Sequence, residues 1–315
     1  MTAFAMVFPG QGAQTVGMVD ALAADFPQIK RRYAQASEIL KFDLWALVTD
    51  GPREVLNQSE HTQPALLAAS VATWDIWCAL GGRRPSLLAG HSFGEYSALV
   101  CADALDFEAA VGLVAARGRL MQDAVRPPLR GAMAAVLGLD AEVLEAVCAQ
   151  AAGDDIVACA NLNAPGQVVI SGTAEAVARA AELAKARGAK KVIPLTVSVA
   201  AHCALMAPAA IHFAELVAAI ALRPPQIPVI HNVDVTAHPV PADIRHALVA
   251  QLAKPVRWQA TIEYFARAGV TQVVECGPGK VLGPLIKRCA PDLKTLPLGS
   301  PAELRAALAA GLKDL

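Results

Sequence analysis

A serine lies between two glycines in the segment GHSFG at residues 90–94. This G-x-S-x-G pattern is typical of a nucleophile elbow when a strand precedes it and a helix follows it. The run SLLAG at 86–90 predicts the strand, and EYSALVCADAL at 95–105 predicts the helix. In such a turn the hydroxyl of Ser92 projects at a helix N-terminus, where the amide of Phe93 can stabilise an oxyanion. We expect a nucleophile here; the alternative is an ordinary turn with a solvated serine.

A serine nucleophile needs a general base, and the chain has seven histidines. His91 is adjacent to the serine, but a tight elbow directs neighbouring side chains apart. His212 and His246 fall in amphipathic helical segments, where surface histidines are expected. His202, in VSVAAHCALM, follows a predicted strand and precedes a helix, where sites of α/β proteins collect. We therefore favour His202, and no aspartate spacing marks a third member of a triad.

The composition limits the class of protein. With 315 residues, 55% of them hydrophobic, the chain can bury one large core, or a large core and a smaller one. A net charge of −1 argues against nucleic acid or a membrane surface as a partner. No apolar run approaches a membrane span, and the N-terminus lacks the basic region of a secretion signal. Seven scattered cysteines without metal-ligand spacing favour a reducing cytoplasm and no metal site.

Short β-like runs alternate with helical segments, which predicts an α/β protein with a mainly parallel sheet. Asp106 is placed to cap the helix that follows it. The expected elements are strands at 3–8, 86–90, 227–235 and 271–277, and helices at 63–80, 106–125, 203–221, 242–253 and 280–289.

The middle of the chain has another rhythm, β-α-β-β-α-β, which is the ferredoxin-like order. Its expected elements are strands at 132–139, 156–163, 167–172 and 191–199 and helices at 141–152 and 174–188. We predict a small inserted domain at 128–198, hinged at Pro127-Pro128. The large α/β domain is then discontinuous, at 1–127 and 199–315, and the cleft between the two is the expected place for a site.

Six segments of the chain carry a resemblance to a known family. They are FPGQGAQTVGM (8–18), TQPALLAASVA (62–72), GHSFGEYSALVCA (90–102), NAPGQVVISG (163–172), HCALM (202–206) and VVECGPGKVL (273–282). In this order they resemble the malonyl-CoA:acyl carrier protein transacylases of bacterial fatty acid synthesis. The resemblance runs nearly end to end, and it implies a hydrolase-like α/β domain with a ferredoxin-like insert.

The resemblance also implies roles for particular residues. Ser92 would be the nucleophile and His202 its base, with the backbone carbonyl of Gln251 orienting the imidazole. The backbone amides of Gln11 and Phe93 would form the oxyanion hole. The site would therefore be a dyad that the main chain supports.

Arg117, in VAARGRLMQ, matches the arginine that binds the free carboxylate of the malonyl group. A planar guanidinium can hold a carboxylate through two parallel hydrogen bonds. The implied reaction is a ping-pong transfer of malonyl from malonyl-CoA to Ser92, and then to the phosphopantetheine thiol of acyl carrier protein. It needs no metal and no bound cofactor. A basic run at 185–191 is a candidate for steering the acidic carrier protein.

Three other functions remain open from the sequence. A thioesterase-type hydrolase shares the elbow, a related malonyl transfer serves polyketide synthesis or malonate decarboxylation, and an inactive scaffold would only bind carrier protein. Two positions depart from the family pattern: Ala200-Ala201 stand where proline or a bulkier residue is expected, and Phe93 stands where leucine is more usual. These departures leave open how strictly the pocket takes malonyl rather than methylmalonyl.

Overall fold

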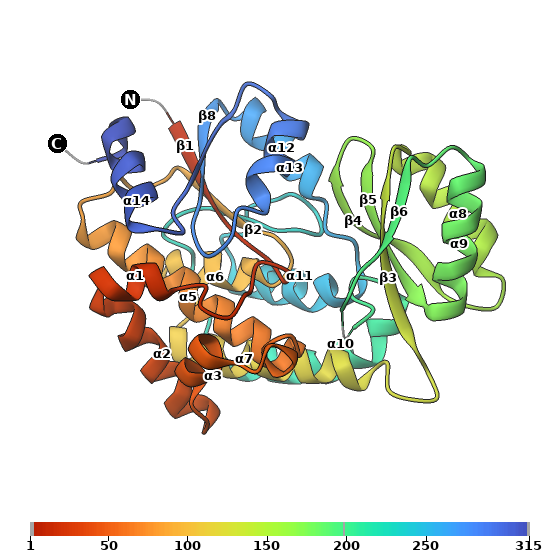
Figure 1. The fold of residues 1–315 in the computed structure, drawn as a ribbon, viewed down its shortest axis with the longest axis horizontal. Coiled ribbons are helices and arrows are strands. Elements are labelled where there is room, and N and C mark those ends of the chain that lie inside the picture. The colour runs from red at the N-terminus through yellow and green to blue at the C-terminus, as the bar shows by residue number, and fades with distance from the viewer. Residues whose placement is uncertain (1–2, 198, 314–315) are drawn as a thin grey trace.

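The computed structural model describes residues 3–197 and 199–313, so predictions that include Met1, Thr2, Ser198 or the last two residues lie partly outside the described residues. A five-stranded parallel sheet, in the order β7-β2-β1-β8-β9, forms the centre of the larger body (Figure 1). The α/β class with a parallel sheet is confirmed. Its strands are β1 (Ala3–Phe8), β2 (Leu87–Gly90), β7 (Val229–Ile230), β8 (Val270–Glu275) and β9 (Lys294–Pro297).

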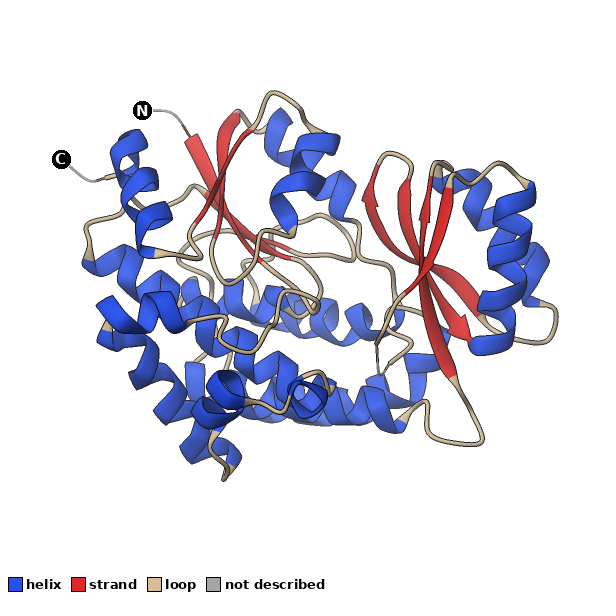
Figure 2. Cartoon of the chain, viewed as in Figure 1, coloured by secondary structure: helices blue, strands red, loops and turns tan. Residues whose placement is uncertain are grey.

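Helices cover this sheet, because their apolar faces and the apolar strands exclude water together (Figure 2). They are α1 (Asp20–Asp25), α2 (Pro27–Leu40), α3 (Leu44–Asp50), α4 (Arg53–Leu56), α5 (Ser59–Ala79), α6 (Gly94–Cys101), α7 (Phe107–Asp123), α10 (Ala207–Ala219), α11 (Pro241–Ala253), α12 (Trp258–Arg267), α13 (Leu282–Cys289) and α14 (Pro301–Ala307), with short turns η1 (Ala204–Met206) and η2 (Leu308–Leu312).

A second sheet is antiparallel and stands apart from the first, at the right of Figure 1. Its order is β4-β5-β3-β6, and α8 (Ala141–Ala152) and α9 (Ala174–Ala186) cover its outer face. The strands are β3 (Gly131–Leu137), β4 (Val157–Ala164), β5 (Gln167–Thr173) and β6 (Lys191–Pro194). The predicted element order β-α-β-β-α-β is confirmed. We propose residues 128–198 as the inserted domain and 1–127 with 199–315 as the large one.

Two predicted strands are much shorter than expected. β6 ends at Pro194, and the segment that follows bends towards the large body, where Leu195 and Val197 line a cavity. β7 has two residues, because the chain turns back at His231, whose amide donates to the carbonyl of Thr236. The runs predicted at 191–199 and 227–235 are rich in apolar β-branched residues, which are typical of strands. In the structure, the strands cover only Lys191–Pro194 and Val229–Ile230 of these runs.

Asp106 has the predicted position at the start of a helix, but the prediction that its side chain caps that helix is wrong. The residue is at the N-cap of α7, but its side chain makes no capping hydrogen bond. Its carboxylate instead binds the guanidinium of Arg223, with oxygen–nitrogen distances of 2.8 and 3.4 Å.

Helices α5 and α7 pack closely and so set the position of Arg117. Helix α5 is buried on nearly every face, as its continuous apolar sequence predicted. On α7, a Cβ atom at Gly118 would lie 2.4 Å from the carbonyl oxygen of Ser59. Only glycine permits this approach, which brings the neighbouring Arg117 against Gln63 of α5.

Candidate active site

Ser92 occupies the tight turn between β2 and α6, with a φ of +53°. A residue other than glycine in the left-handed region costs about 1–3 kcal/mol, so the surroundings must hold it there. The flanking glycines are required by contact. A Cβ at Gly90 would lie 1.9 Å from the carbonyl carbon of Gly94, and one at Gly94 would lie 2.5 Å from the oxygen of Phe8. The predicted strand, turn and helix are therefore present.

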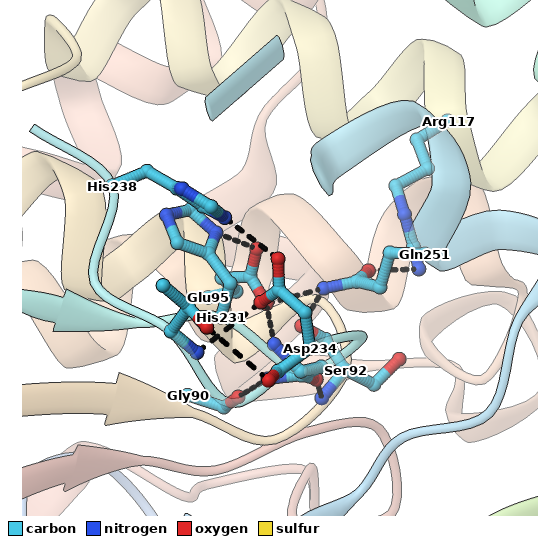
Figure 3. A network of polar contacts seen from close by, with 10 residues as sticks. Gly90, Ser92, Glu95, Arg117, His231, Asp234, His238 and Gln251 are labelled. Atoms are coloured by element: carbon cyan, nitrogen blue, oxygen red, sulfur yellow. Dashed lines mark hydrogen bonds and ion pairs between the residues drawn. The ribbon is translucent and has the colours of Figure 1, made fainter. Parts of the chain in front are cut away.

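Asn232, just after β7, binds both sides of this turn (Figure 3, where Gly90 and Ser92 are labelled). Its side-chain oxygen accepts from the amide of Ser92 at 2.7 Å, and its side-chain nitrogen donates to the carbonyl of Gly90 at 2.7 Å. The Asn232 side chain is fully buried. These two bonds fix the strained peptide groups on each side of His91.

The hydroxyl of Ser92 and the imidazole of His202 are hydrogen-bonded, with Oγ 2.7 Å from Nε2. The other ring nitrogen, Nδ1, lies 2.7 Å from the backbone carbonyl of Gln251. A carbonyl only accepts, so Nδ1 carries the proton and Nε2 is free to accept the proton of Ser92. Gln251 Oε1 is not involved: the carbonyl is available because its helical partner four residues on is Pro255, which has no N–H.

Burial keeps His202 neutral. The residue is 2% exposed, and its desolvation is the main reason that its pKa is lowered to about 3. The positive charge of Arg117 lowers the pKa further, whereas the bond to the Gln251 carbonyl opposes the shift. A neutral imidazole next to a hydroxyl has the protonation state that a general base needs.

Arg117 lies in the same cavity with 1% of its surface exposed. It donates to the side-chain oxygens of Gln63 at 3.0 Å and Gln251 at 2.9 Å, and its guanidinium lies 5.7 Å from the ring centre of Tyr96. Within the described residues no carboxylate forms an ion pair with it. Burial lowers its pKa, and the neighbouring Tyr96 and Glu95 raise it. The site thus offers a buried cation whose side-chain hydrogen bonds go to two neutral amides.

Gln11 and Phe93 flank the serine. The loop after β1 packs against the elbow, since a Cβ at Gly10 would lie 2.7 Å from the carbonyl of His91. This contact brings Gln11 into the cavity of Ser92. Phe93 is buried, and it is the N-cap residue of α6. Among the hydrogen bonds of the described chain, the backbone amides of Gln11 and Phe93 make none.

The cavity has a volume of about 90 Å³ and lies between the two bodies of the chain. His91 also lines the cavity, whereas we expected the elbow to direct its side chain away from Ser92. The imidazole bonds Asn163, with Nε2 2.8 Å from the side-chain oxygen. Most of the remaining wall is apolar. Its lining residues are Gln11, His91, Ser92, Arg117, Met121, Met133, Asn161, Leu195, Val197, Val199, Ala201 and His202.

Three further residues of the site were missed by the sequence reasoning: Asn232, Gln63 and Glu95. Glu95 had a visible signal, because it is the only charged residue at the start of an otherwise apolar helix. Asn232 lies inside the strand predicted at 227–235, so its place beyond a strand end appears only in the structure, where β7 ends at Ile230. Gln63 had no signal, since its role depends on how α5 and α7 pack.

Two kinds of feature are absent from residues 3–197 and 199–313. No group of histidine, cysteine and acidic side chains there could hold a metal ion. None of the helices in this part of the chain is both long and apolar enough to span a bilayer.

Comparisons with known proteins agree along nearly the whole chain. The family model of the acyl transferase domain matches residues 5–292. The malonyl CoA-acyl carrier protein transacylase of Escherichia coli (strain K12) is 51% identical, over 98% of this chain and 99% of the relative. The protein of the same name from Bacillus subtilis (strain 168) is 44% identical, over 98% and 97%.

Solved structures give the same picture. An acyl carrier protein S-malonyltransferase from Vibrio cholerae has a TM-score of 0.94 and 52% identity, over 97% of this chain and 99% of that one. A malonyl-transacylase in complex with a holo acyl-carrier protein of a type II polyketide synthase has a TM-score of 0.96 and 51% identity, over 98% and 100%.

Proposed function

This chain belongs to the acyl transferase family, and we propose that it moves malonyl from malonyl-CoA to the phosphopantetheine thiol of acyl carrier protein. The product, malonyl-carrier protein, supplies fatty acid synthesis. The observation that carries the proposal is the presence of Arg117 in the cavity of Ser92 and His202. A buried cation without a carboxylate partner favours an acyl group that brings its own carboxylate.

In the first half of the reaction, His202 Nε2 takes the proton of Ser92 while Oγ attacks the thioester carbonyl of malonyl-CoA. The carbonyl oxygen becomes an oxyanion, which the backbone amides of Gln11 and Phe93 stabilise. The carbon–sulfur bond then breaks, and the imidazolium of His202 returns the proton to the coenzyme A sulfur. A malonyl ester of Ser92 remains.

In the second half the carrier protein's thiol gives its proton to His202, and its sulfur attacks the malonyl ester. The ester bond breaks, and His202 protonates Oγ of Ser92, so the enzyme returns to its starting state. The Gln251 carbonyl stabilises the imidazolium in both halves by accepting from Nδ1–H. All chemical steps use side chains and backbone amides of this chain, and neither a metal nor a bound cofactor takes part.

Arg117 selects the substrate. The malonyl carboxylate can replace the amide oxygens of Gln63 and Gln251 on the guanidinium. An acetyl group offers no such acceptor, and it would leave the buried cation with amide partners only. The apolar wall opposite, which includes Met121 and Met133, accommodates the methylene of the acyl chain.

A second candidate acceptor is the carrier protein of a polyketide synthase. The 51% identical transacylase in complex with such a carrier supports this alternative. Positive side chains near β6, Lys190 and Lys191, together with Arg288, line one surface hollow and would attract either acidic carrier. We also propose a cytoplasmic location, in keeping with the free thiols of all seven cysteines.

The acceptor assay tests the proposal. The protein is mixed with malonyl-CoA and a holo fatty-acid carrier protein, and malonyl-carrier and free malonate are both measured by mass spectrometry. We expect malonyl-carrier to form far faster than malonate. Malonate as the main product would instead establish a hydrolase, and transfer to a polyketide carrier alone would establish the second candidate.

A further inference from the structure

We propose that Glu95 is a positioning residue for the nucleophile: one oxygen of its carboxylate holds the two groups that fix the Ser92 backbone. Ser92 acts as the nucleophile only if the proposed acyl transfer is right, so the inference rests on that function. Glu95 lies in the first turn of α6, three residues after Ser92, and its side chain has no exposed surface (Figure 3).

The carboxylate of Glu95 accepts three hydrogen bonds. Oε1 accepts from Nδ1 of His231 at 2.7 Å. Oε2 accepts from the backbone amide of Asn232 at 2.9 Å and from Nε2 of Gln251 at 2.9 Å. A buried carboxylate needs such donors, because an unpaired charge in an apolar interior is very costly. The donors belong to two segments that are far from α6 in the sequence: the loop after β7, which holds His231 and Asn232, and helix α11, which holds Gln251.

Both residues that bind Oε2, Asn232 and Gln251, also form hydrogen bonds with the backbone of Ser92. The Asn232 side chain accepts from the Ser92 amide at 2.7 Å, and Gln251 Nε2 also donates to the Ser92 carbonyl at 3.0 Å. One carboxylate oxygen therefore fixes the residues that bind Ser92 on both its N–H and its C=O. With a φ of +53°, Ser92 keeps its conformation only if such contacts outweigh the strain.

Glu95 also determines which way the Gln251 amide faces. The two groups around Gln251 Nε2, the carboxylate and the Ser92 carbonyl, are acceptors only, so the nitrogen must face them. The oxygen Oε1 is then directed at Arg117. This arrangement links the nucleophile turn to the arginine through one amide group.

The other oxygen of Glu95 bonds the side chain of His231, the residue before Asn232. His231 packs against His238, with ring centres 5.0 Å apart, and His238 Nε2 bonds Asp234 at 2.7 Å (Figure 3). This branch does not return to Ser92. It therefore provides a control, because a change at His231 alters the surroundings of Glu95 without touching Oε2.

Two conservative variants separate position from charge. In Glu95→Gln, the amide oxygen can replace Oε2 and keep both bonds, while its NH₂ faces His231 Nδ1. His231 can accept there if its proton moves to Nε2, which has no hydrogen-bond partner among the described residues. In Glu95→Asp the charge is kept, but the shorter side chain withdraws from Asn232 and Gln251.

The main readout is the rate at which a fluorophosphonate labels Ser92, since this reagent has no carboxylate and does not depend on Arg117. We expect Glu95→Gln to label within about fivefold of the unmodified enzyme and Glu95→Asp at least about twentyfold more slowly. The control His231→Asn, whose amide nitrogen can replace Nδ1, should stay within about twofold. Circular dichroism melting curves establish that each variant is folded at the assay temperature.

The opposite order, with Glu95→Asp labelling as fast as or faster than Glu95→Gln, would overturn the inference in favour of a charge effect. Slow labelling of His231→Asn would also overturn it, because the labelling rate would then depend on contacts of Glu95 other than those of Oε2. The proposed function fails separately: in that case the unmodified enzyme is labelled by the fluorophosphonate but gives no malonyl ester with malonyl-CoA.

Discussion

Arg117 and Gln251 are joined by a 2.9 Å hydrogen bond from the guanidinium to the side-chain oxygen of the glutamine. The backbone carbonyl of the same glutamine accepts from His202. One residue at the end of α11 therefore contacts both the group that we propose recognises the substrate carboxylate and the group that we propose activates the nucleophile. Because neutral amides hold the arginine, a substrate carboxylate can displace them without breaking an ion pair.

Replacement of Arg117 tests its role in substrate choice. In Arg117→Met we expect the ratio of kcat/KM for malonyl-CoA over acetyl-CoA to fall by about 10- to 100-fold, the effect of losing a charged hydrogen bond of about 1.5–3 kcal/mol. Steady-state transfer to holo-carrier protein measures both substrates. The control is Arg119→Met, an exposed arginine on the same helix, which should leave the ratio unchanged. An unchanged ratio in Arg117→Met would remove Arg117 from substrate recognition.

The pH dependence of Ser92 labelling tests the buried state of His202. With its pKa lowered to about 3, the imidazole stays neutral well below its ordinary pKa of 6.5, so the labelling rate should not drop between about pH 7.5 and about pH 5. In Arg117→Met the nearby positive charge is gone, so the pKa of His202 rises and the acid-side fall moves to higher pH. A fall centred near the ordinary histidine pKa in the unmodified enzyme would contradict this account.

The free energy of unfolding should depend on pH between about pH 6.5 and about pH 3, because His202 is harder to protonate in the folded chain than in the unfolded one. The unfolded chain takes up a proton on His202 near its ordinary pKa, whereas the folded chain resists it until about pH 3. The unfolded state thus binds more protons between these values, so this histidine's contribution to the free energy of unfolding falls as the pH drops from about 6.5. We expect the difference in free energy of unfolding between the unmodified protein and His202→Gln, measured by urea titration, to be smaller at acid pH than at neutral pH. An equal difference at both would exclude the burial effect.

The glycine requirement of the elbow can be tested with one methyl group. In Gly90→Ala the new Cβ meets backbone atoms of Gly94 and Glu95 at 1.9–2.2 Å, so the turn must open. We expect a loss of about 1–3 kcal/mol or more in the free energy of unfolding, together with loss of Ser92 labelling. In Gly112→Ala, inside α7, the nearest atom beyond the helix's own backbone is Cγ2 of Ile39, 3.9 Å away, so stability should be unchanged or should rise by up to about 1 kcal/mol. Similar losses in both variants would contradict the steric argument.

The sequence predicted the elements around Ser92 well because their signals are local. Glycines on both sides of a serine, an apolar run before it and a helical run after it lie within twenty residues. The β-α-β-β-α-β order of the second sheet was equally readable from the alternation of apolar runs. These signals concern backbone conformation, which nearby residues largely determine.

The rest of the site depends on contacts between distant segments. Ser92 and Asn232 are separated by 140 positions, and Arg117 and Gln251 by 134. No spacing rule brings such pairs together, so Asn232 and the hydrogen-bond partners of Glu95 could be found only from the folded chain. The lengths of β6 and β7 were overestimated for a related reason: apolar residues that are typical of strands line the cavity after β6 and lie in the loop after β7.

The central claim is that Ser92 carries the malonyl group between donor and acceptor. The protein is incubated with malonyl-CoA alone, quenched in acid, and examined by intact mass and peptide mass spectrometry, with Ser92→Ala as the control. We predict one added malonyl group on the peptide that contains Ser92, lost on addition of holo-carrier protein and absent from Ser92→Ala. An adduct on a cysteine, or the same adduct in Ser92→Ala, would contradict the mechanism.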